Sequence, residues 1–360
     1  MSLAFTLEKR VAISAVVRAC SLTSQVFQKL VKNETLTKND KSPVTVADFS
    51  AQAVVNAILE KSFPHDPIVG EEDSADLRSP SAEDLRKHLT SLANDALHLP
   101  VREDEGSLLE DASWGIGPSS PTRSTDELLS IIDRGNYAGG STGRMWALDP
   151  IDGTKGFLRG GQYAVCLALI ENSVVQVGVM GCPNLPVSGA NPDGEKGCIF
   201  VAVRGQGAEQ RPLSNLSLSI PLIHAPTVPS MSSVALLESL EAAHSSHSFS
   251  DRLSKHLGIT SAPLRMDSQA KYACLARGEG GLYFRMPVKG SGYKEKIWDH
   301  ASGTLLVEEA GAIVSDSRGQ PLNFGLGRTL GENHGVVASF KGIHSQVIEA
   351  VKKANAEEAD

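Results

Sequence analysis

The sequence of 360 residues contains few cysteines, and their spacing excludes two classes of site. Only five occur, widely separated, and no C-x-x-C pair is present. A disulfide-stapled scaffold or a structural zinc site needs closely and regularly spaced cysteines. We therefore expect small buried thiols in a reducing compartment at Cys20, Cys166, Cys182, Cys198 and Cys274.

The sequence also lacks a long apolar run and an excess of basic residues. No stretch is long enough to span a bilayer, and Met1–Lys9 has no apolar core of a signal peptide. The net charge of −8 argues against a general nucleic-acid binder, because a phosphate backbone selects a basic surface. We therefore expect a cytoplasmic globular protein with no membrane or nucleic-acid partner. We also expect a monomer, although neither observation bears on the oligomeric state. A small anionic ligand needs only a local basic pocket.

Helical and strand-like patterns alternate along the chain. The first 33 residues predict an amphipathic helix, and residues 41–48 predict a loop before a second helix that ends near Lys61. Residues 101–123 are rich in Ser, Pro, Gly and acids and predict an exposed insertion. Further helices are predicted at 79–100, 126–133, 251–257, 268–276, 299–310 and 343–354, and strands at 67–70, 148–151, 163–170, 174–181, 197–203, 234–238, 264–266, 281–285, 312–315 and 335–339.

This order predicts an α/β fold with an α+β N-terminal half and an α/β C-terminal half, in which helices pack on sheets. The capping-box pattern Ser124-x-x-Glu127 predicts the start of a helix. We expect Trp146, Tyr163 and Trp298 to be core residues.

The most informative motif is Asp149-Pro150-Ile151-Asp152-Gly153-Thr154. Proline fixes one φ angle and cannot continue a ladder, so the two flanking carboxylates can turn toward one point beyond a strand end. Gly153 permits a tight turn, and Thr154 adds a hydroxyl. Hard cations such as Mg²⁺ prefer oxygen ligands and usually bind a substrate phosphate as well. The motif indicates metal-assisted phosphate chemistry, although an ordinary turn has the same composition.

Three further acids, Asp48, Glu71 and Asp299, stand where a helix start or a strand end would expose them. Each has an ordinary interpretation, Asp48 and Asp299 as helix N-caps and Glu71 as part of a solvated acidic run. Thr154 could likewise cap the turn that follows it. Their occurrence together with the Asp149/Asp152 pair favours a shared site, because one pair of cations could take ligands from separate elements.

Three strings, Gly70-Glu71-Glu72, Asp149–Thr154 and Trp298–Ala301, resemble the signatures of the lithium-sensitive, magnesium-dependent phosphatases. This superfamily includes inositol monophosphatase, inositol polyphosphate 1-phosphatase and fructose-1,6-bisphosphatase. Longer strings, at 41–48, 149–160, 267–272 and 295–300, resemble the 3′(2′),5′-bisphosphate nucleotidases of fungi and plants. The resemblance implies a layered αβαβα sandwich, with most metal ligands in an N-terminal domain (1–165) and the nucleotide-binding residues in a C-terminal domain (166–360).

The resemblance also implies hydrolysis of the 3′-phosphate of adenosine 3′,5′-bisphosphate to AMP and phosphate, and action on 3′-phosphoadenylyl sulfate. It implies two to three Mg²⁺ ions, inhibition by Li⁺, and a role in sulfate assimilation and salt tolerance. Thr154 would hydrogen-bond the attacking water, and Asp48 would accept its proton through Thr154. The implied metal ligands are Glu71, Asp149, the carbonyl of Ile151, Asp152 and Asp299.

Basic residues gather late in this acidic sequence and suit a second phosphate: Lys271, Arg285, Lys294 and Lys296. Ser268 and Lys271 are expected at one helix start, three residues apart and facing the same way. The resemblance assigns substrate contacts to Thr154, His244, Ser268, Lys271 and Arg285, with Glu238 as a further candidate. Two alternatives stay open, an inositol polyphosphate 1-phosphatase and a catalytically silent nucleotide sensor. The string Asp267–Tyr272 favours the nucleotide, and no expected metal ligand is missing.

Overall fold

The computed structural model describes residues 3–32, 42–100, 112–223, 230–240, 247–287 and 292–357. The α-helices within these ranges are α1 (Thr6–Lys32), α2 (Ser42–Ser62), α3 (Glu83–His98), α4 (Thr125–Asp133), α5 (Thr154–Leu158), α6 (His247–Leu257), α7 (Ala270–Ala276), α8 (Ala301–Glu309) and α9 (His344–Ala356). The strands are β1 (Ile68–Gly70), β2 (Arg144–Asp152), β3 (Ala164–Glu171), β4 (Val174–Pro186), β5 (Lys196–Val203), β6 (Gly207–Pro212), β7 (Ile220–Leu222), β8 (Leu236–Glu238), β9 (Leu264–Arg265), β10 (Leu282–Arg285), β11 (Ala312–Ser315) and β12 (Val336–Phe340). In these parts of the chain, no helix combines the length and the apolarity needed to cross a membrane.

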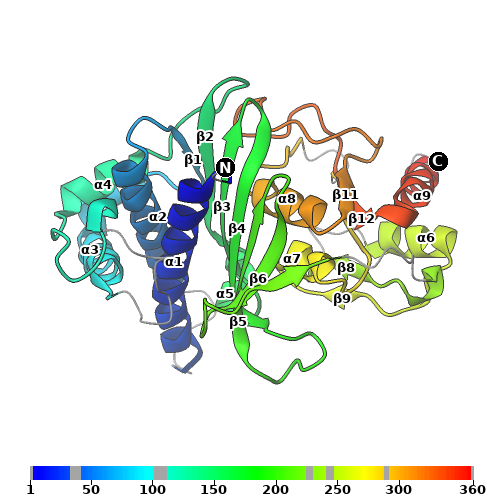
Figure 1. The fold of residues 1–360 in the computed structure, drawn as a ribbon, viewed down its shortest axis with the longest axis horizontal. Helices are drawn as coiled ribbons and strands as arrows, with labels where there is room; N and C mark the ends of the chain where they lie inside the picture. The colour runs from blue at the N-terminus through cyan, green and yellow to red at the C-terminus, as the bar shows by residue number, and fades with distance from the viewer. Residues whose placement is uncertain are drawn as a thin grey trace.

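Helices and sheets alternate in five layers (Figure 1). The helices α1 and α2 cover one face of a seven-stranded sheet, with α3 and α4 packed outside them. The helices α7 and α8 lie between that sheet and a second, five-stranded sheet, whose outer face is covered by α6 and α9. The expected αβαβα sandwich is confirmed.

The seven-stranded sheet is buried on both faces, which explains the apolar runs of its central strands. Its order is β1 to β7, with β1 and β2 parallel and the other neighbours antiparallel. Along β3, Val165 and Leu167 face the α1/α2 core, whereas Ala164 and Cys166 face the core around α7 and α8. Residues 165 and 166, between which the sequence suggests a domain boundary, are thus neighbours within this central strand.

The five-stranded sheet has the order β11-β12-β10-β8-β9, and it lies between the core around α7 and α8 and the core under α6 and α9. On β10, Leu282 and Phe284 pack toward α6 and α9, and Tyr283 packs toward α7. The predicted capping box at the start of α4 is present. The Ser124 side chain accepts a hydrogen bond from the backbone N–H of Glu127, and the Glu127 carboxylate accepts one from the backbone N–H of Ser124. As expected, all five cysteines are buried and free, and the three predicted core aromatics are buried: Trp146, Tyr163 and Trp298.

Three local expectations differ from the structure. The predicted loop at 41–48 is instead helical from Ser42, where α2 begins, since Val44 and Val46 are buried and packing overrides their low helix propensity. The strands β6 and β7 were not expected, because their sequences alternate weakly and carry prolines. In the described part of the predicted exposed insertion, Trp114 and Ile116 are buried and fasten residues 112–123 to the helical layer.

Candidate functional site

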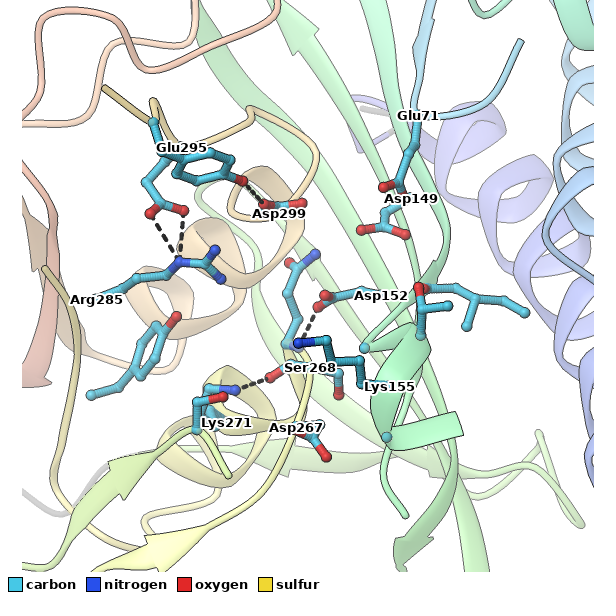
Figure 2. A pocket seen from close by; sticks show the side chains of 18 of the residues that line it. Glu71, Asp149, Asp152, Lys155, Asp267, Ser268, Lys271, Arg285, Glu295 and Asp299 are labelled. Atoms are coloured by element: carbon cyan, nitrogen blue, oxygen red, sulfur yellow. Dashed lines mark hydrogen bonds and ion pairs between the residues drawn. The ribbon is translucent and has the colours of Figure 1, made fainter. Parts of the chain in front are cut away.

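The parallel pairing of β1 and β2 brings the first two acids together. Gly70 is opposite Leu148 in this pair, and the N–H of Glu71 donates to the Leu148 carbonyl at 3.2 Å. Glu71 and Asp149 are therefore the next residues of two neighbouring parallel strands. Parallel strands end at the same edge of a sheet, so both carboxylates reach one place, as Figure 2 shows.

Pro150 interrupts the pairing of β2 with β3, and a register shift lies between Asp149 and Asp152. Such a bulge turns the strand and re-aims its side chains. Gly153 then adopts φ +88°, and α5 begins at Thr154, so Gly153 rather than Thr154 occupies the N-cap position. The turn therefore delivers Asp149 and Asp152 to one side, as the Asp-Pro-x-Asp-Gly pattern predicts.

A pocket of about 540 Å³ opens beyond these acids. It is formed by the end of β2, the start of α5, the segment before α7, the end of β10 and the turn before α8 (Figure 2). Its lining residues are Glu71, Asp149, Ile151, Asp152, Gly153, Thr154, Lys155, Gly156, Ser239, Asp267, Ser268, Gln269, Lys271, Tyr283, Arg285, Met286, Tyr293, Glu295 and Asp299.

Four carboxylates crowd one end of the pocket. Oxygens of Asp149, Asp152 and Asp299 lie within 4.8 Å of one another, and Glu71 lies beside Asp149 (Figure 2). Loss of water contact is the largest cause that raises the pKa of all four carboxyls. The negative charge of the neighbouring acids adds to this shift for Glu71, Asp149 and Asp299, and the pKa reaches about 8 for Glu71 and about 6 for Asp299.

This acidic end fits a divalent cation. Asp149 is only 1% exposed, and its Oδ1 has no hydrogen-bond partner within the described structure. A desolvated carboxylate oxygen without a donor is costly, and a cation would relieve both the missing contact and the repulsion between the acids. The donor set consists of hard oxygens, which is the set that Mg²⁺ prefers.

Two cations face the acids from the other side of the pocket (Figure 2). Lys271 is buried, and its Nζ donates to the Ser268 carbonyl at 2.7 Å. Burial lowers the pKa of Lys271 to about 8, although the charge of Asp152 opposes this shift. Arg285 Nε donates to Glu295, and although burial disfavours its charge, Glu295 helps to raise the pKa of the guanidinium.

A chain of buried hydrogen-bonded groups holds Glu295, the partner of Arg285, in place. The second oxygen of Glu295 lies 3.0 Å from His300 Nε2, and His300 Nδ1 lies 2.8 Å from the hydroxyl of Tyr272. His300 is also the N-cap residue of α8. The alternative interpretation of Asp299 as that N-cap is therefore wrong, and its side chain is available to the pocket.

Asp48 is not a helix cap or a surface acid. It lies inside α2 with 6% exposure, and its Oδ1 has no partner in the described part of the chain. Burial, and then the charges of Glu72 and Glu71, raise its pKa well above the usual range. Thr154 Oγ1 donates to the Ile151 carbonyl at 3.4 Å rather than to Asp48. Asp48 is thus close enough to Glu71 and Glu72 for their charges to act on its carboxyl, but it does not line the pocket.

The other predicted residues fall into three groups. Ser268 and Lys271 line the pocket, but α7 begins only at Ala270, so Ser268 precedes the helix with φ +67° instead of sharing its first turn. His244 lies outside the described residues. The remaining candidates do not line the pocket: Glu238, which is buried and pairs with Arg265, and the lysines Lys294 and Lys296.

Sequence reasoning missed several lining residues. Lys155 follows Thr154 and adds a third basic side chain to the pocket (Figure 2). Asp267 accepts from Arg159 at 2.5 Å and fixes the segment before α7 against α5. Lys155 and Asp267 both lie within strings that carry the resemblance, so that signal was present. Ser239 and Tyr293 carry no such signal.

The sequence profile of the inositol monophosphatase family matches residues 7–356. A 3′(2′),5′-bisphosphate nucleotidase of Schizosaccharomyces pombe is 49% identical over 354 residues, covering 97% of this chain and 96% of that protein. A 3′(2′),5′-bisphosphate nucleotidase of Emericella nidulans is 46% identical over 358 residues, covering 96% of this chain and 97% of that protein. The chain belongs to the inositol monophosphatase family.

A solved family structure has the same fold. An inositol monophosphatase from Zymomonas mobilis aligns with a TM-score of 0.59 at 20% identity, covering 98% of this chain and 100% of that one. Within the family, the resemblance to fungal bisphosphate nucleotidases that the longer strings indicated is confirmed by the curated relatives.

Proposed function

We propose that this family member is a phosphatase that removes the 3′-phosphate of adenosine 3′,5′-bisphosphate and yields AMP and phosphate. The observation that carries the proposal is the division of one pocket into an acidic end and a basic side. A substrate with two phosphates matches this division, because one phosphate would meet cations held by the acids and the other would meet Lys271 and Arg285. The names of the curated relatives support the same substrate.

The acidic end would hold two to three Mg²⁺ ions. We assign Glu71, Asp149 and the Ile151 carbonyl to one ion and Asp149, Asp152 and Asp299 to a second, with Glu71 also near a weaker third. Bound Mg²⁺ would supply charge neutralisation for the phosphate and the leaving oxygen, and acidity for an attacking water. The crowding of the carboxylates and the partnerless Asp149 Oδ1 support this assignment.

Thr154 and Asp48 would handle the proton. The Thr154 hydroxyl borders the pocket beside the acids, where it can accept a hydrogen bond from water while it donates one to another oxygen. In the present arrangement it donates to the Ile151 carbonyl. We propose that this hydroxyl turns toward the buried Asp48, whose carboxylate would then accept the proton of the water through Thr154.

The basic side would orient the nucleotide. We assign Lys271, Arg285 and the segment at Ser268 to the nucleotide and its 5′-phosphate, with Thr154 and His244 as further contacts. Arg285 presents a planar set of donors that matches a phosphate, and Glu295 holds its Nε end. The remaining donors of Arg285 stay directed to the pocket (Figure 2).

The proposal extends to properties that the resemblance implies. We expect activity on 3′-phosphoadenylyl sulfate, inhibition by Li⁺, and a role in sulfate assimilation and salt tolerance through removal of the bisphosphate. Li⁺ would inhibit because it can occupy a magnesium position without supplying its charge. We also propose a monomer in the cytoplasm, with an N-terminal domain (1–165) and a C-terminal domain (166–360) that meet within β3.

A phosphate-release assay over a few substrates tests the proposal. The full chain is incubated with adenosine 3′,5′-bisphosphate, 3′-phosphoadenylyl sulfate or inositol 1,4-bisphosphate, each with Mg²⁺, with Mg²⁺ and Li⁺, or with EDTA. We expect rapid release from both nucleotides with Mg²⁺, inhibition by Li⁺ and no release with EDTA. Faster turnover of the inositol bisphosphate would identify an inositol phosphatase instead. Tight nucleotide binding without turnover would identify a silent sensor.

A further inference from the structure

Arg328 connects two segments of the chain that each carry an acid of the pocket. Its guanidinium donates through Nη2 to the carbonyl of Gly70, the residue directly before Glu71. Through Nη1 it donates to the carbonyls of Gly135 at 3.0 Å and Tyr137 at 3.1 Å, in the segment that pairs with β1. One side chain therefore fixes the backbone at the end of β1.

The same guanidinium lies over the ring of Trp298, with 4.7 Å between its central carbon and the ring centroid. Trp298 is 5% exposed and directly precedes Asp299. The backbone strengthens this link, because the N–H of Ile297 donates to the Arg328 carbonyl at 3.2 Å and the N–H of Leu330 donates to the Glu295 carbonyl at 2.8 Å. Arg328 is thus fixed to the Asp299 segment by its ring contact and by its backbone.

The two connected acids come from distant parts of the fold. Glu71 follows a strand of the seven-stranded sheet, and Asp299 lies in the turn before α8. They carry like charges in one pocket and therefore tend to separate when no cation lies between them. A contact that spans both segments would oppose this separation and keep the acids spaced for a shared cation.

We propose that Arg328 is a positioning residue that holds the Glu71 and Asp299 segments at a fixed separation and thereby sets the affinity of the pocket for Mg²⁺. The inference rests on the proposed metal site and adds a residue outside it, since Arg328 does not line the pocket. Lysine could not replace it, because the role needs planar donors to several carbonyls together with a flat face over an indole.

Calorimetric titration of Mg²⁺ into the metal-free full chain, without substrate, tests this role in wild type, R328M and R328K. Arg318 supplies a matched control, since it also donates to a backbone carbonyl, that of Glu332, and is ion-paired with Asp316, but it touches neither acidic segment. Residues that orient metal ligands typically change metal affinity by about 10–100-fold. We expect R328M to bind Mg²⁺ on the order of tenfold more weakly, R328K to bind more weakly than wild type, and R318M to match wild type.

Near-UV circular dichroism identifies variants that keep their tertiary packing. Folded R328M and R328K with wild-type Mg²⁺ affinity would overturn the inference, even if their melting temperatures fall. If R328M fails to fold, R328K decides the question on the same criterion, since it keeps the charge and most of the volume. A wild-type chain that binds no Mg²⁺ would overturn the proposed function and this inference together, whereas equal affinities of wild type and variants would overturn the inference alone.

Discussion

Replacing Asp149 by asparagine should stabilise the metal-free protein while it removes activity. Asp149 faces Asp152 and Asp299 with oxygens within 4.8 Å. At that separation two unit charges repel by about 3.5 kcal/mol with an effective dielectric constant of about 20. Protonation limits the realised repulsion, because burial and the charges of the neighbouring acids raise the pKa of Asp149 well above its usual range. We therefore expect the free energy of unfolding of metal-free D149N to exceed that of wild type by on the order of 1–2 kcal/mol near pH 7.5. This difference corresponds to a rise of a few degrees in melting temperature.

Activity should change in the opposite direction. Asp149 is the shared ligand of both proposed ions, and Lewis-acid stabilisation of phosphoryl transfer is worth several kcal/mol. At about 1.36 kcal/mol per factor of ten, its loss should lower kcat/KM by about 10²–10³-fold or more. Thermal melts with and without Mg²⁺ and steady-state phosphate release measure the two effects. The stabilisation of wild type by Mg²⁺ should be nearly absent in D149N.

Asp316 provides the contrasting control. It is fully buried like Asp149, but its oxygens accept from Arg318 and from backbone N–H groups, so D316N should destabilise the protein. A metal-free D149N that melts below wild type would refute the repulsion argument. Wild-type turnover in D149N would refute the shared-ligand assignment.

Three further changes test other parts of the account. Arg285→Met should raise KM for adenosine 3′,5′-bisphosphate about tenfold, because a charge-assisted hydrogen bond is worth about 1.5–3 kcal/mol; unchanged steady-state KM would contradict this role. Gly156→Ala should lower the urea midpoint of unfolding, because the added Cβ would lie 2.3 Å from the Gln162 carbonyl oxygen. A midpoint equal to that of wild type would show that the backbone at this turn can shift to accept the methyl group at no cost in stability. His344 lies between two serine hydroxyls, and burial lowers its pKa. The neutral imidazole therefore stabilises the folded protein above pH 6.5, and this contribution to the free energy of unfolding is lost as the pH falls through the lowered pKa. Urea unfolding of H344N should therefore depend less on pH between 7.5 and 5.0 than that of wild type, and an equal dependence would exclude this cause.

The acidic end of the pocket was predictable because its signals are local. Asp149 and Asp152 flank a proline that breaks the ladder of β2, and Glu71 follows a short apolar run that could only be a strand. Strand ends, prolines and glycines are visible in a sequence without knowledge of the fold. The layer order was predictable by resemblance, and the alternation of β3 between two cores agrees with its apolar run.

The supporting contacts were not predictable, since they join residues far apart in sequence. The chain from Tyr272 through His300 to Glu295 and Arg285 exists only because α7, α8 and β10 meet. Gln52, inside α2, accepts from the N–H of Glu72 and donates back to its carbonyl, which fixes the chain after Glu71. A buried glutamine in a helical pattern gives no sign of such a partner.

Asp48 illustrates a second limit. The preceding residues Val44 and Val46 have low helix propensity, and the sequence predicts a loop at 41–48. Their burial against the core makes the segment helical and places Asp48 inside α2. Tertiary packing decided the conformation, and local preference could not reveal it.

The most direct test of the proposed metal-dependent 3′-phosphatase reaction is a ³¹P NMR record of adenosine 3′,5′-bisphosphate incubated with the metal-free chain while Mg²⁺ is added. The account predicts no change before Mg²⁺, then loss of the 3′-phosphate resonance with retention of the 5′-phosphate, giving AMP and phosphate in equal amounts. Hydrolysis without added Mg²⁺, or loss of the 5′-phosphate instead, would contradict it.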